Sequence, residues 1–264
     1  MTRKKILLVI VEGPSDETAL GYALSQVYDR EQVYIQVVHG DITIKDRASS
    51  SNIVTMVGNE VKKFLDNNPF KPSDFKGIIH IVDMDGAFAP DEVIVDDPEC
   101  EKCNYSDTEI RTDSGERIKK RNAQKRDTLF RLIGTGKVRA IPYRVYYMSC
   151  NLDHVLYDKR NSTDEEKEND AYDFATRYKG DVEGFLHFMC ESDFSVNEEY
   201  KDSWKYIETE LHSLERHSNL CVFLREEKDR IEKRTMNTAT DLGVRHSDFG
   251  KHQQDRIERN DGIS

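Results

Sequence analysis

The sequence predicts an α/β fold in which a parallel sheet is flanked by helices, followed by a mainly helical C-terminal half. Three apolar runs, Ile6–Val11, 33–38 and 78–82, have the length of buried strands, and they alternate with segments of helical apolar spacing. A strand–helix–strand–helix–strand order with short connections is typical of parallel strands joined by right-handed crossovers. We therefore expect residues 1–150 to form one α/β domain.

The other elements follow from spacing and from helix-breaking residues. Ser15 or Asp16 is the expected N-cap of the first helix, and Pro69 ends the second. The remaining predicted elements are a helix from about residue 17, a helix from about 51, a loop or small insertion at 88–115, a helix at 116–133 and a strand at 138–148. A helical extension is expected at 151–224. The polar tail at 225–264 is expected to be a solvated helix or disordered.

Composition limits the function classes. The chain has 264 residues, 37% of them hydrophobic and 34% charged, and a net charge of −11, which argues against a general nucleic-acid coat. No apolar stretch approaches the roughly 18 residues of a membrane span, so we expect no membrane contact. The first apolar run is too short for a signal peptide, and five cysteines, an odd count, fit reduced thiols. We expect a cytoplasmic protein.

Carboxylates stand where two of the predicted strands end. Glu12 follows the first strand, and Asp83 and Asp85 follow the third. Ligands bind at this edge of an open α/β sheet. Because strand side chains alternate, Asp83 and Asp85 are expected on one face, where they can converge on a cation with Glu12. Clustered carboxylates repel unless a cation neutralises them, which predicts Mg²⁺ or Mn²⁺. Gly13 and Gly86 are expected to let a phosphate approach the backbone.

An apolar strand ending in Val11-Glu12-Gly13-Pro14-Ser15-Asp16, with a later strand ending in Asp83-Met84-Asp85, resembles the TOPRIM domain of topoisomerases, DnaG-type primases and OLD-family nucleases. The resemblance covers about residues 5–150. It implies a compact parallel sheet with Glu12 near the reacting phosphate and Asp83 and Asp85 holding Mg²⁺ or Mn²⁺. These three residues are the predicted catalytic set.

Two further acids extend the predicted metal site. Glu12 and Asp16 resemble the E-x3-E pattern of OLD-type nucleases with Asp in place of the second Glu, which leaves one or two metals open. The segment 149–153 resembles one that follows the last strand in small TOPRIM-like defence proteins. Asp153 would then be a further ligand and His154 a phosphate or base contact. Equally, this segment can be a helix N-cap with Leu152 buried.

Basic residues dominate the predicted helix at 116–133. A solvated helix face, or a surface for an acidic partner, explains this charge as well as a contact to a phosphate backbone does. In the solvated-face interpretation Leu129, Phe130 and Ile133 pack inward. The residues assigned to nucleic-acid binding are Lys119, Lys120, Arg121, Lys125 and Arg126.

Other motifs are weaker. Cys100 and Cys103 have zinc-ligand spacing, but no second ligand pair follows them closely. His80, inside the third strand, is expected to be a core residue. No G-x4-G-K-[ST] loop is present, whereas OLD-type nucleases usually carry an ATPase domain. An ATPase partner in trans is therefore expected, and a homo-oligomer is left open.

The leading prediction is a Mg²⁺-dependent TOPRIM nuclease that cuts DNA or RNA. The resemblance to small defence-associated proteins extends this prediction to prokaryotic anti-phage defence. The alternative is a non-catalytic TOPRIM-like regulatory or interaction subunit of such a complex. A phosphotransfer or nucleotidyl-transfer enzyme that uses the same acids is a third hypothesis.

Overall fold

The computed structural model describes residues 4–28 and 31–241 and divides into two compact units, Met1–Leu224 and Arg225–Ser264. The sheets and every predicted site residue belong to the first unit. Helix α8 (Leu220–Asp241) covers the first part of the predicted polar tail. The rest of that tail, 242–264, lies outside the described residues.

The main sheet has five strands in the order β2-β1-β3-β8-β7, and the first four run parallel. These strands are β1 (Ile6–Val11), β2 (Gln32–Val37), β3 (Phe75–Asp83), β7 (Lys137–Val138) and β8 (Ile141–Met148). Strand β1 lies between β2 and β3, and all six of its residues are buried. The prediction of an α/β fold with a mostly parallel sheet is confirmed.

The predicted strand at 138–148 is two antiparallel strands, because β7 and β8 form a hairpin in which Val138 pairs with Ile141. The two residues between them, Arg139 and Ala140, have φ values of +48° and +66°. Positive φ at both central positions is the geometry of a tight hairpin turn that glycine or asparagine usually provides. Neither glycine nor asparagine occupies these two positions, so the sequence does not signal a turn here.

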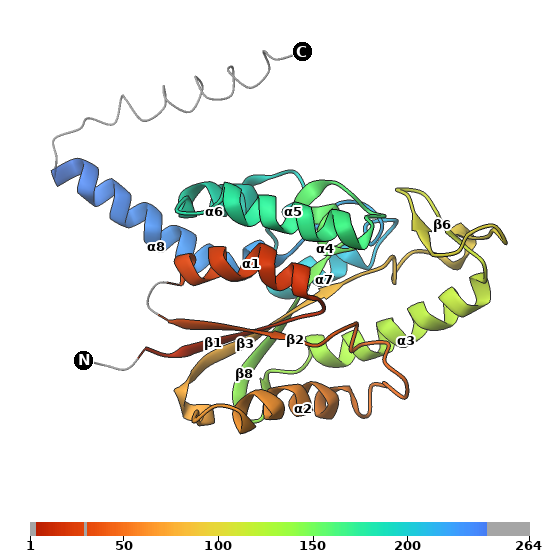
Figure 1. Cartoon of the computed structure of the whole chain (residues 1–264), viewed down its shortest axis with the longest axis horizontal. Coiled ribbons are helices and arrows are strands. Elements are labelled where there is room, and N and C mark those ends of the chain that lie inside the picture. Colours follow the sequence, from red (N-terminus) through yellow and green to blue (C-terminus); the bar gives the residue numbers. More distant parts are fainter. Residues whose placement is uncertain (1–3, 29–30, 242–264) are drawn as a thin grey trace, which may run out of the picture. The chain divides into compact units, whose positions relative to one another are not determined.

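Helices cover both faces of the main sheet (Figure 1). Helices α2 and α3 pack on one face, and α1, α4, α5 and α6 lie on the other. The helices of the first unit are α1 (Pro14–Val27), α2 (Ile53–Asp66), α3 (Gly115–Ile133), α4 (Leu152–Tyr157), α5 (Asp164–Arg177), α6 (Val182–Glu191) and α7 (Tyr200–Ile207), with 3-10 turns η1 (Pro72–Asp74) and η2 (Asp91–Val93). Two covered faces explain why the strands are apolar at consecutive positions.

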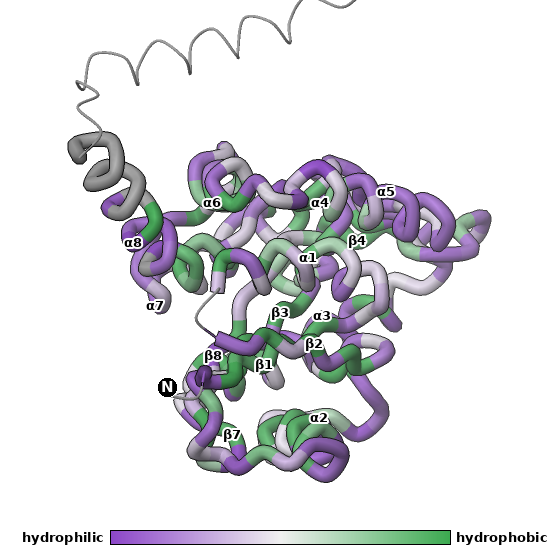
Figure 2. Tube along the Cα trace, turned by 60° about the vertical axis from the view of Figure 1, so that its left-hand side comes forward, coloured by the Kyte–Doolittle hydropathy of each residue, from purple (hydrophilic) through white to green (hydrophobic). Residues whose placement is uncertain are grey.

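The largest core cluster lies between the sheet and helices α2 and α3. It includes Leu8 of β1, Val57 of α2 and Leu129 of α3. His80 is buried in β3 with its Nδ1 atom 2.8 Å from the hydroxyl of Tyr143, so the prediction that it is a core residue is confirmed. Figure 2 shows the strands as mainly hydrophobic and α5 as mainly hydrophilic on its outer side.

The stretch 88–115 is a small folded insertion. It contains a three-stranded sheet in the order β4-β6-β5 and packs with Ile118 and Leu214 into a second small core. The strands are β4 (Ile94–Asp96), β5 (Asn104–Tyr105) and β6 (Ile110–Thr112). Strands of two or three residues have too little alternation for a sequence pattern to reveal them.

The C-terminal half of the first unit is helical, as predicted, and it completes the domain. Helix α5 packs on α1, and α7 contacts β8 through the Tyr200 hydroxyl, which donates a hydrogen bond to the carbonyl of Val145 over 3.0 Å. In the described part of the chain, no helix combines the length and apolarity that a membrane crossing requires.

Gly86 is required by packing in the turn after β3. Its φ is +66°, and an added Cβ would lie 2.6 Å from Leu214 Cδ2 and 2.8 Å from Ile110 Cδ1. The expectation that this glycine opens the backbone to a phosphate is wrong, because the space beside it is filled by these two side chains.

Gly86→Ala is expected to lower the free energy of unfolding by about 2–4 kcal/mol, from left-handed strain and overpacking together. Urea denaturation measures this change. The matched control is Gly136→Ala, where an added Cβ meets nothing within 4 Å. An equal loss in both variants would contradict the packing explanation.

Candidate functional site

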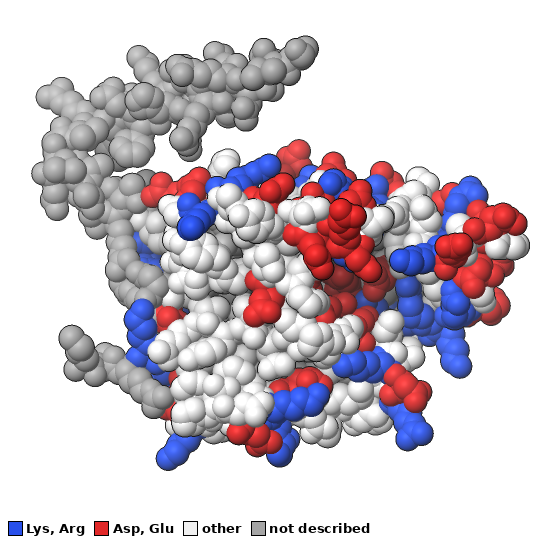
Figure 3. Space-filling model, viewed as in Figure 1, with Lys and Arg blue, Asp and Glu red and all other residues white. Residues whose placement is uncertain are grey.

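Predicted acids gather at the carboxyl-terminal edge of the main sheet. Glu12 follows β1, and Asp83 is the last residue of the neighbouring strand β3. The backbone N–H of Asp83 donates a hydrogen bond to Glu12 Oε1 over 3.2 Å. Figure 3 shows a group of acidic side chains on this side of the molecule, over α5 and the start of α1. The strand order thus brings together two acids that are 71 residues apart in the sequence.

A buried lysine neutralises two other acids at the same edge. The Nζ atom of Lys125 lies 2.7 Å from Asp41 Oδ2 and 2.6 Å from Asp85 Oδ2, and its side chain is 0% exposed. Asp41, which the sequence analysis missed, also accepts hydrogen bonds from the backbone N–H and the hydroxyl of Thr43 over 2.7 Å and 2.5 Å. The position of Asp41 in the sequence could have identified it as a site residue, because it comes soon after a strand, as Glu12 does.

Asp85 does not share a face with Asp83, so that prediction is wrong. The extended conformation ends at Asp83, and Asp85 has a φ of +49°. Its backbone N–H donates a hydrogen bond to the carbonyl of Cys150 over 2.7 Å. The turn directs the Asp85 carboxylate to Lys125, whereas Asp83 Oδ1 accepts a hydrogen bond from the N–H of Leu152 over 2.9 Å.

Asp16 and Asp153 belong to the half of the site that contains Asp83. Asp16 is the third residue of α1, whose N-cap is Gly13, and its Oδ2 atom accepts a hydrogen bond from the Gly13 N–H over 2.9 Å. Asp153 is buried in the first turn of α4, with its Oδ2 atom 3.4 Å from Nζ of Lys167. Lys167 comes from α5 and was also missed by the sequence analysis, because α5 has no local motif that connects it with the strand ends.

Glu12 and Asp83 lie among other acids, and their pKa values are raised. Burial, and then repulsion from Asp41 and Asp83, raises the pKa of Glu12 well above its ordinary value. Burial, followed by repulsion from Asp16, does the same to the pKa of Asp83. Burial raises the pKa of Asp16 to about 6, and repulsion from Asp153 adds to this effect. The pKa of Asp153 is also raised by burial, which Lys167 only partly offsets.

The pKa of Asp85 shifts in the other direction. Burial alone would raise it, but the charges of Lys125 and Arg121 outweigh burial and lower the pKa. Burial likewise acts to lower the pKa of Lys125, and the carboxylates of Asp41 and Asp85 reverse this effect and raise it. Asp85 and Lys125 are therefore a charged pair at neutral pH.

The residues fit a hard divalent cation in donor chemistry. Glu12, Asp16 and Asp83 offer only carboxylate oxygens, which Mg²⁺ and Mn²⁺ prefer, and a cation would relieve their repulsion. Their oxygens are not gathered as three ligands within 4.8 Å of one another. Within residues 4–28 and 31–241, only His212, Glu215 and His217 meet that spacing. Side-chain rotation is needed before the three acids can share one ion.

The basic residues of α3 mostly brace the loop after β3. Arg121 donates hydrogen bonds to the Asp85 carbonyl and the Tyr105 hydroxyl over 2.7 Å and 2.8 Å, and Arg126 donates one to the Ala87 carbonyl over 2.7 Å. Lys125 is fully buried, so the prediction that it contacts nucleic acid is wrong for this structure, whereas Arg121 and Arg126 are half-buried. Lys119 pairs with Glu116 on the surface, and Lys120 is exposed.

The remaining candidate residues are a buried histidine and two free thiols. His154 is fully buried, and burial lowers its pKa to about 4, so it cannot contact a phosphate in this structure. Cys100 and Cys103 are partly exposed free thiols, and in the described part of the chain no histidine or acid joins them in a three-ligand group. Phe130, expected to pack inward, is 52% exposed.

Comparison of the chain with protein-family models, with curated proteins and with solved structures finds no match in any of the three.

Lys125→Met is expected to lower the free energy of unfolding by about 3–5 kcal/mol, because it leaves Asp41 and Asp85 buried without a cation. Thermal and urea denaturation measure the effect. Lys120→Met, an exposed position on the same helix, is the matched control and is expected to change stability by less than about 0.5 kcal/mol. Similar stability of the two variants would refute the structural role of Lys125.

The raised pKa of Asp83 predicts a pH dependence. A carboxyl whose pKa is raised by folding stabilises the fold when protonated, and this contribution is lost as the pH rises through the folded-state pKa. Asp83→Asn is neutral at every pH and keeps the acceptor for Leu152. We therefore expect the unfolding free energy of Asp83→Asn, minus that of the wild type, to increase as the pH rises above about 4, the ordinary pKa of an unfolded aspartate, in chelator-treated protein.

The control for this pH series is Asp173→Asn, which alters an exposed aspartate of α5 and is measured under the same conditions. A flat profile for Asp83→Asn would show that Asp83 is not held in a proton-binding environment.

Proposed function

We propose that the chain is a TOPRIM-type nuclease that uses Mg²⁺ or Mn²⁺ to cleave phosphodiester bonds in DNA or RNA. The observation that carries this proposal is the hydrogen bond from the Asp83 N–H to Glu12 at the ends of adjacent strands, where burial and repulsion from neighbouring acids raise the pKa of both. Acids with strongly perturbed pKa values at a sheet edge are typical of functional sites. A purely structural pair has little reason to retain this repulsion.

Glu12, Asp16 and Asp83 would hold the cation. A bound divalent ion supplies charge neutralisation at the phosphate and a more acidic water. Glu12, whose pKa is raised, can accept or return the proton of the attacking water at its carboxylate. Asp83 is positioned by the N–H of Leu152, which leaves its second oxygen for a ligand.

Lys125 has a positioning role in this proposal. Its ion pairs with Asp41 and Asp85 connect α3 with the loops after β2 and β3. The Glu12 carboxylate accepts a hydrogen bond from the backbone N–H of Asp83 at the end of β3. Ion pairs that hold the loops after β2 and β3 therefore also hold the residues around Glu12. Lys167, which is partly exposed beside Asp153, can contact a phosphate, whereas Lys125 of α3 is buried.

A second candidate is a non-catalytic TOPRIM-like subunit that regulates or binds a partner. The observation in its favour is Lys125, which supplies positive charge to Asp85, one of the acids expected to bind metal. Metal binding and cleavage separate the two candidates. An ATPase partner and a role in anti-phage defence are further proposals, and they rest on the resemblance of the Glu12 and Asp83-Met84-Asp85 segments alone.

The test of nuclease activity is a cleavage assay with purified protein, Mg²⁺ or Mn²⁺, and linear DNA, circular DNA and structured RNA as substrates. Asp83→Asn and Glu12→Gln are expected to lower the cleavage rate by at least about 100-fold, because each removes an acid that binds the cation or moves the proton. The control Asp173→Asn should cut at the wild-type rate.

Metal binding is followed in parallel by calorimetry. Equal cutting by the wild type and both site variants would overturn the proposal, since the activity would then come from elsewhere. No cutting and no Mg²⁺ or Mn²⁺ binding would favour the non-catalytic candidate.

A further inference from the structure

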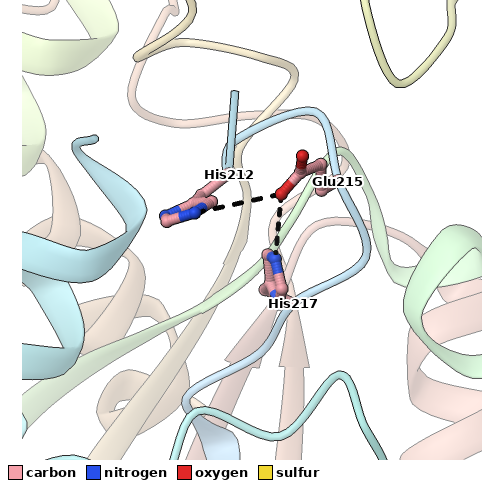
Figure 4. Close-up of side chains that lie close together, drawn as sticks. All are labelled: His212, Glu215 and His217. Carbon is pink, nitrogen blue, oxygen red and sulfur yellow. Dashed lines mark hydrogen bonds and ion pairs between the residues drawn. The ribbon is translucent and has the colours of Figure 1, made fainter. Parts of the chain in front are cut away.

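Three side chains outside the acidic site converge in the loop between α7 and α8. His212, Glu215 and His217 follow the pattern H-x2-E-x-H. The Oε2 atom of Glu215 lies 3.3 Å from Nε2 of His217 and 4.0 Å from Nε2 of His212, and the three ligand atoms all lie within 4.8 Å of one another. Figure 4 shows the two imidazoles approaching the carboxylate from different sides.

A backbone hydrogen bond orients the first imidazole. The Nδ1 atom of His212 lies 2.7 Å from the carbonyl oxygen of Tyr206, which can only accept, so the ring carries its proton on Nδ1. The lone pair is then on Nε2, the atom that faces Glu215. The ring also stacks on Tyr206, with centroids 4.0 Å apart and planes 12° apart. A backbone carbonyl that fixes the tautomer in this way is typical of metal-binding histidines.

Tyr206 also orients the second imidazole. Its ring packs edge-on against His217, with centroids 5.0 Å apart, and its hydroxyl lies 3.3 Å from His217 Nε2. The imidazoles are mostly buried, whereas the Glu215 side chain is 42% exposed. An ion can thus enter from the solvent on the side of the carboxylate.

The backbone that carries these side chains is tied to the end of β8. Ser149 N–H donates a hydrogen bond to the His217 carbonyl over 2.7 Å, and the Ser149 hydroxyl donates one to the His212 carbonyl over 2.6 Å. The Cys150 N–H donates another to the Ser213 carbonyl over 3.1 Å. The loop that carries the three ligands is therefore held in place by hydrogen bonds to the end of β8.

We propose that His212, Glu215 and His217 form a zinc site. Two imidazole nitrogens and one carboxylate are a ligand set of three-ligand zinc centres, whose fourth position is open to water. Ligands of tetrahedral zinc lie about 3.3 Å apart, which follows from bonds of about 2.0–2.1 Å. The Glu215–His217 pair at 3.3 Å already has this spacing, and the Glu215–His212 pair at 4.0 Å is 0.7 Å longer. Mg²⁺ is a poor match, because it prefers oxygen ligands.

Zinc at this position would hold the loop against the turn after β3. Leu214 lies between the ligands in sequence and packs directly over Gly86. The backbone of Cys150 links the loop and the turn after β3. Its N–H donates a hydrogen bond to the Ser213 carbonyl in the loop, and its carbonyl accepts one from the Asp85 N–H in the turn. In this inference zinc braces the loop, and the site does not depend on the proposed nuclease activity.

The test is zinc binding to the Asp83→Asn protein in excess Mg²⁺, which keeps zinc from the acidic site. Competition with a chromophoric chelator, together with metal analysis after gel filtration, is expected to give one Zn²⁺ per chain. Zn²⁺ is also expected to raise the melting temperature. In Glu215→Gln and His217→Gln the affinity should fall by at least about 100-fold.

Two matched controls locate the ion. His187→Gln alters an exposed histidine that pairs with Glu191 in α6, and Cys100→Ser with Cys103→Ser removes the thiol pair. Both should bind zinc as the parent does. Cobalt substitution adds a signature: a tetrahedral nitrogen and oxygen site gives intense visible bands without the thiolate charge-transfer band.

Absence of zinc binding by the folded parent protein would overturn the inference, and the three side chains would then be only a histidine–glutamate ion-pair group. Binding that survives in both Glu215→Gln and His217→Gln, or that disappears in the cysteine variant, would overturn it as well. Circular dichroism verifies that each variant is folded, and Glu215→Gln is decisive because its side chain is partly exposed and similar in size.

Discussion

The buried ammonium group of Lys125 is the interaction on which the site edge depends. It lies 2.7 Å from a carboxylate of the loop after β2 and 2.6 Å from one of the turn after β3. Removing a charge from water costs several kcal/mol, and it is offset only by close partners of opposite sign. The three segments must therefore stay together, since separation of any one of them leaves a buried charge without its partner.

This lysine divides the acids of the edge into two kinds. Asp41 and Asp85 are neutralised by the protein itself, while Glu12, Asp16 and Asp83 remain crowded with their pKa values raised. Repulsion among Glu12, Asp16 and Asp83 is reduced when one of them binds a proton or when they bind an external cation. The same edge thus contains a rigid, self-compensated half and a half that gains from binding positive charge, which is the basis of the proposed metal chemistry.

The C-terminal half contributes to this edge as much as the sheet does. Helix α5 supplies Lys167 beside Asp153, and the loop after α7 packs Leu214 over Gly86. Hydrogen bonds from Ser149 and Cys150 attach that loop to the end of β8. The edge is consequently enclosed by segments that are remote in sequence, and the region beyond residue 150 belongs to the same compact unit up to Leu224.

The sequence by itself determined the α/β order, the buried strands and the presence of acids at two strand ends, because apolar periodicity and chain order are local properties. Only the tertiary structure decided which charges meet. Lys125 pairs with an acid 40 residues away, and the bend at Asp85, at a φ of +49°, separates its carboxylate from that of Asp83. The small insertion strands and the His212 group were also invisible beforehand. Ion pairs, tautomers and pKa values depend on distances across the fold, which local patterns do not encode.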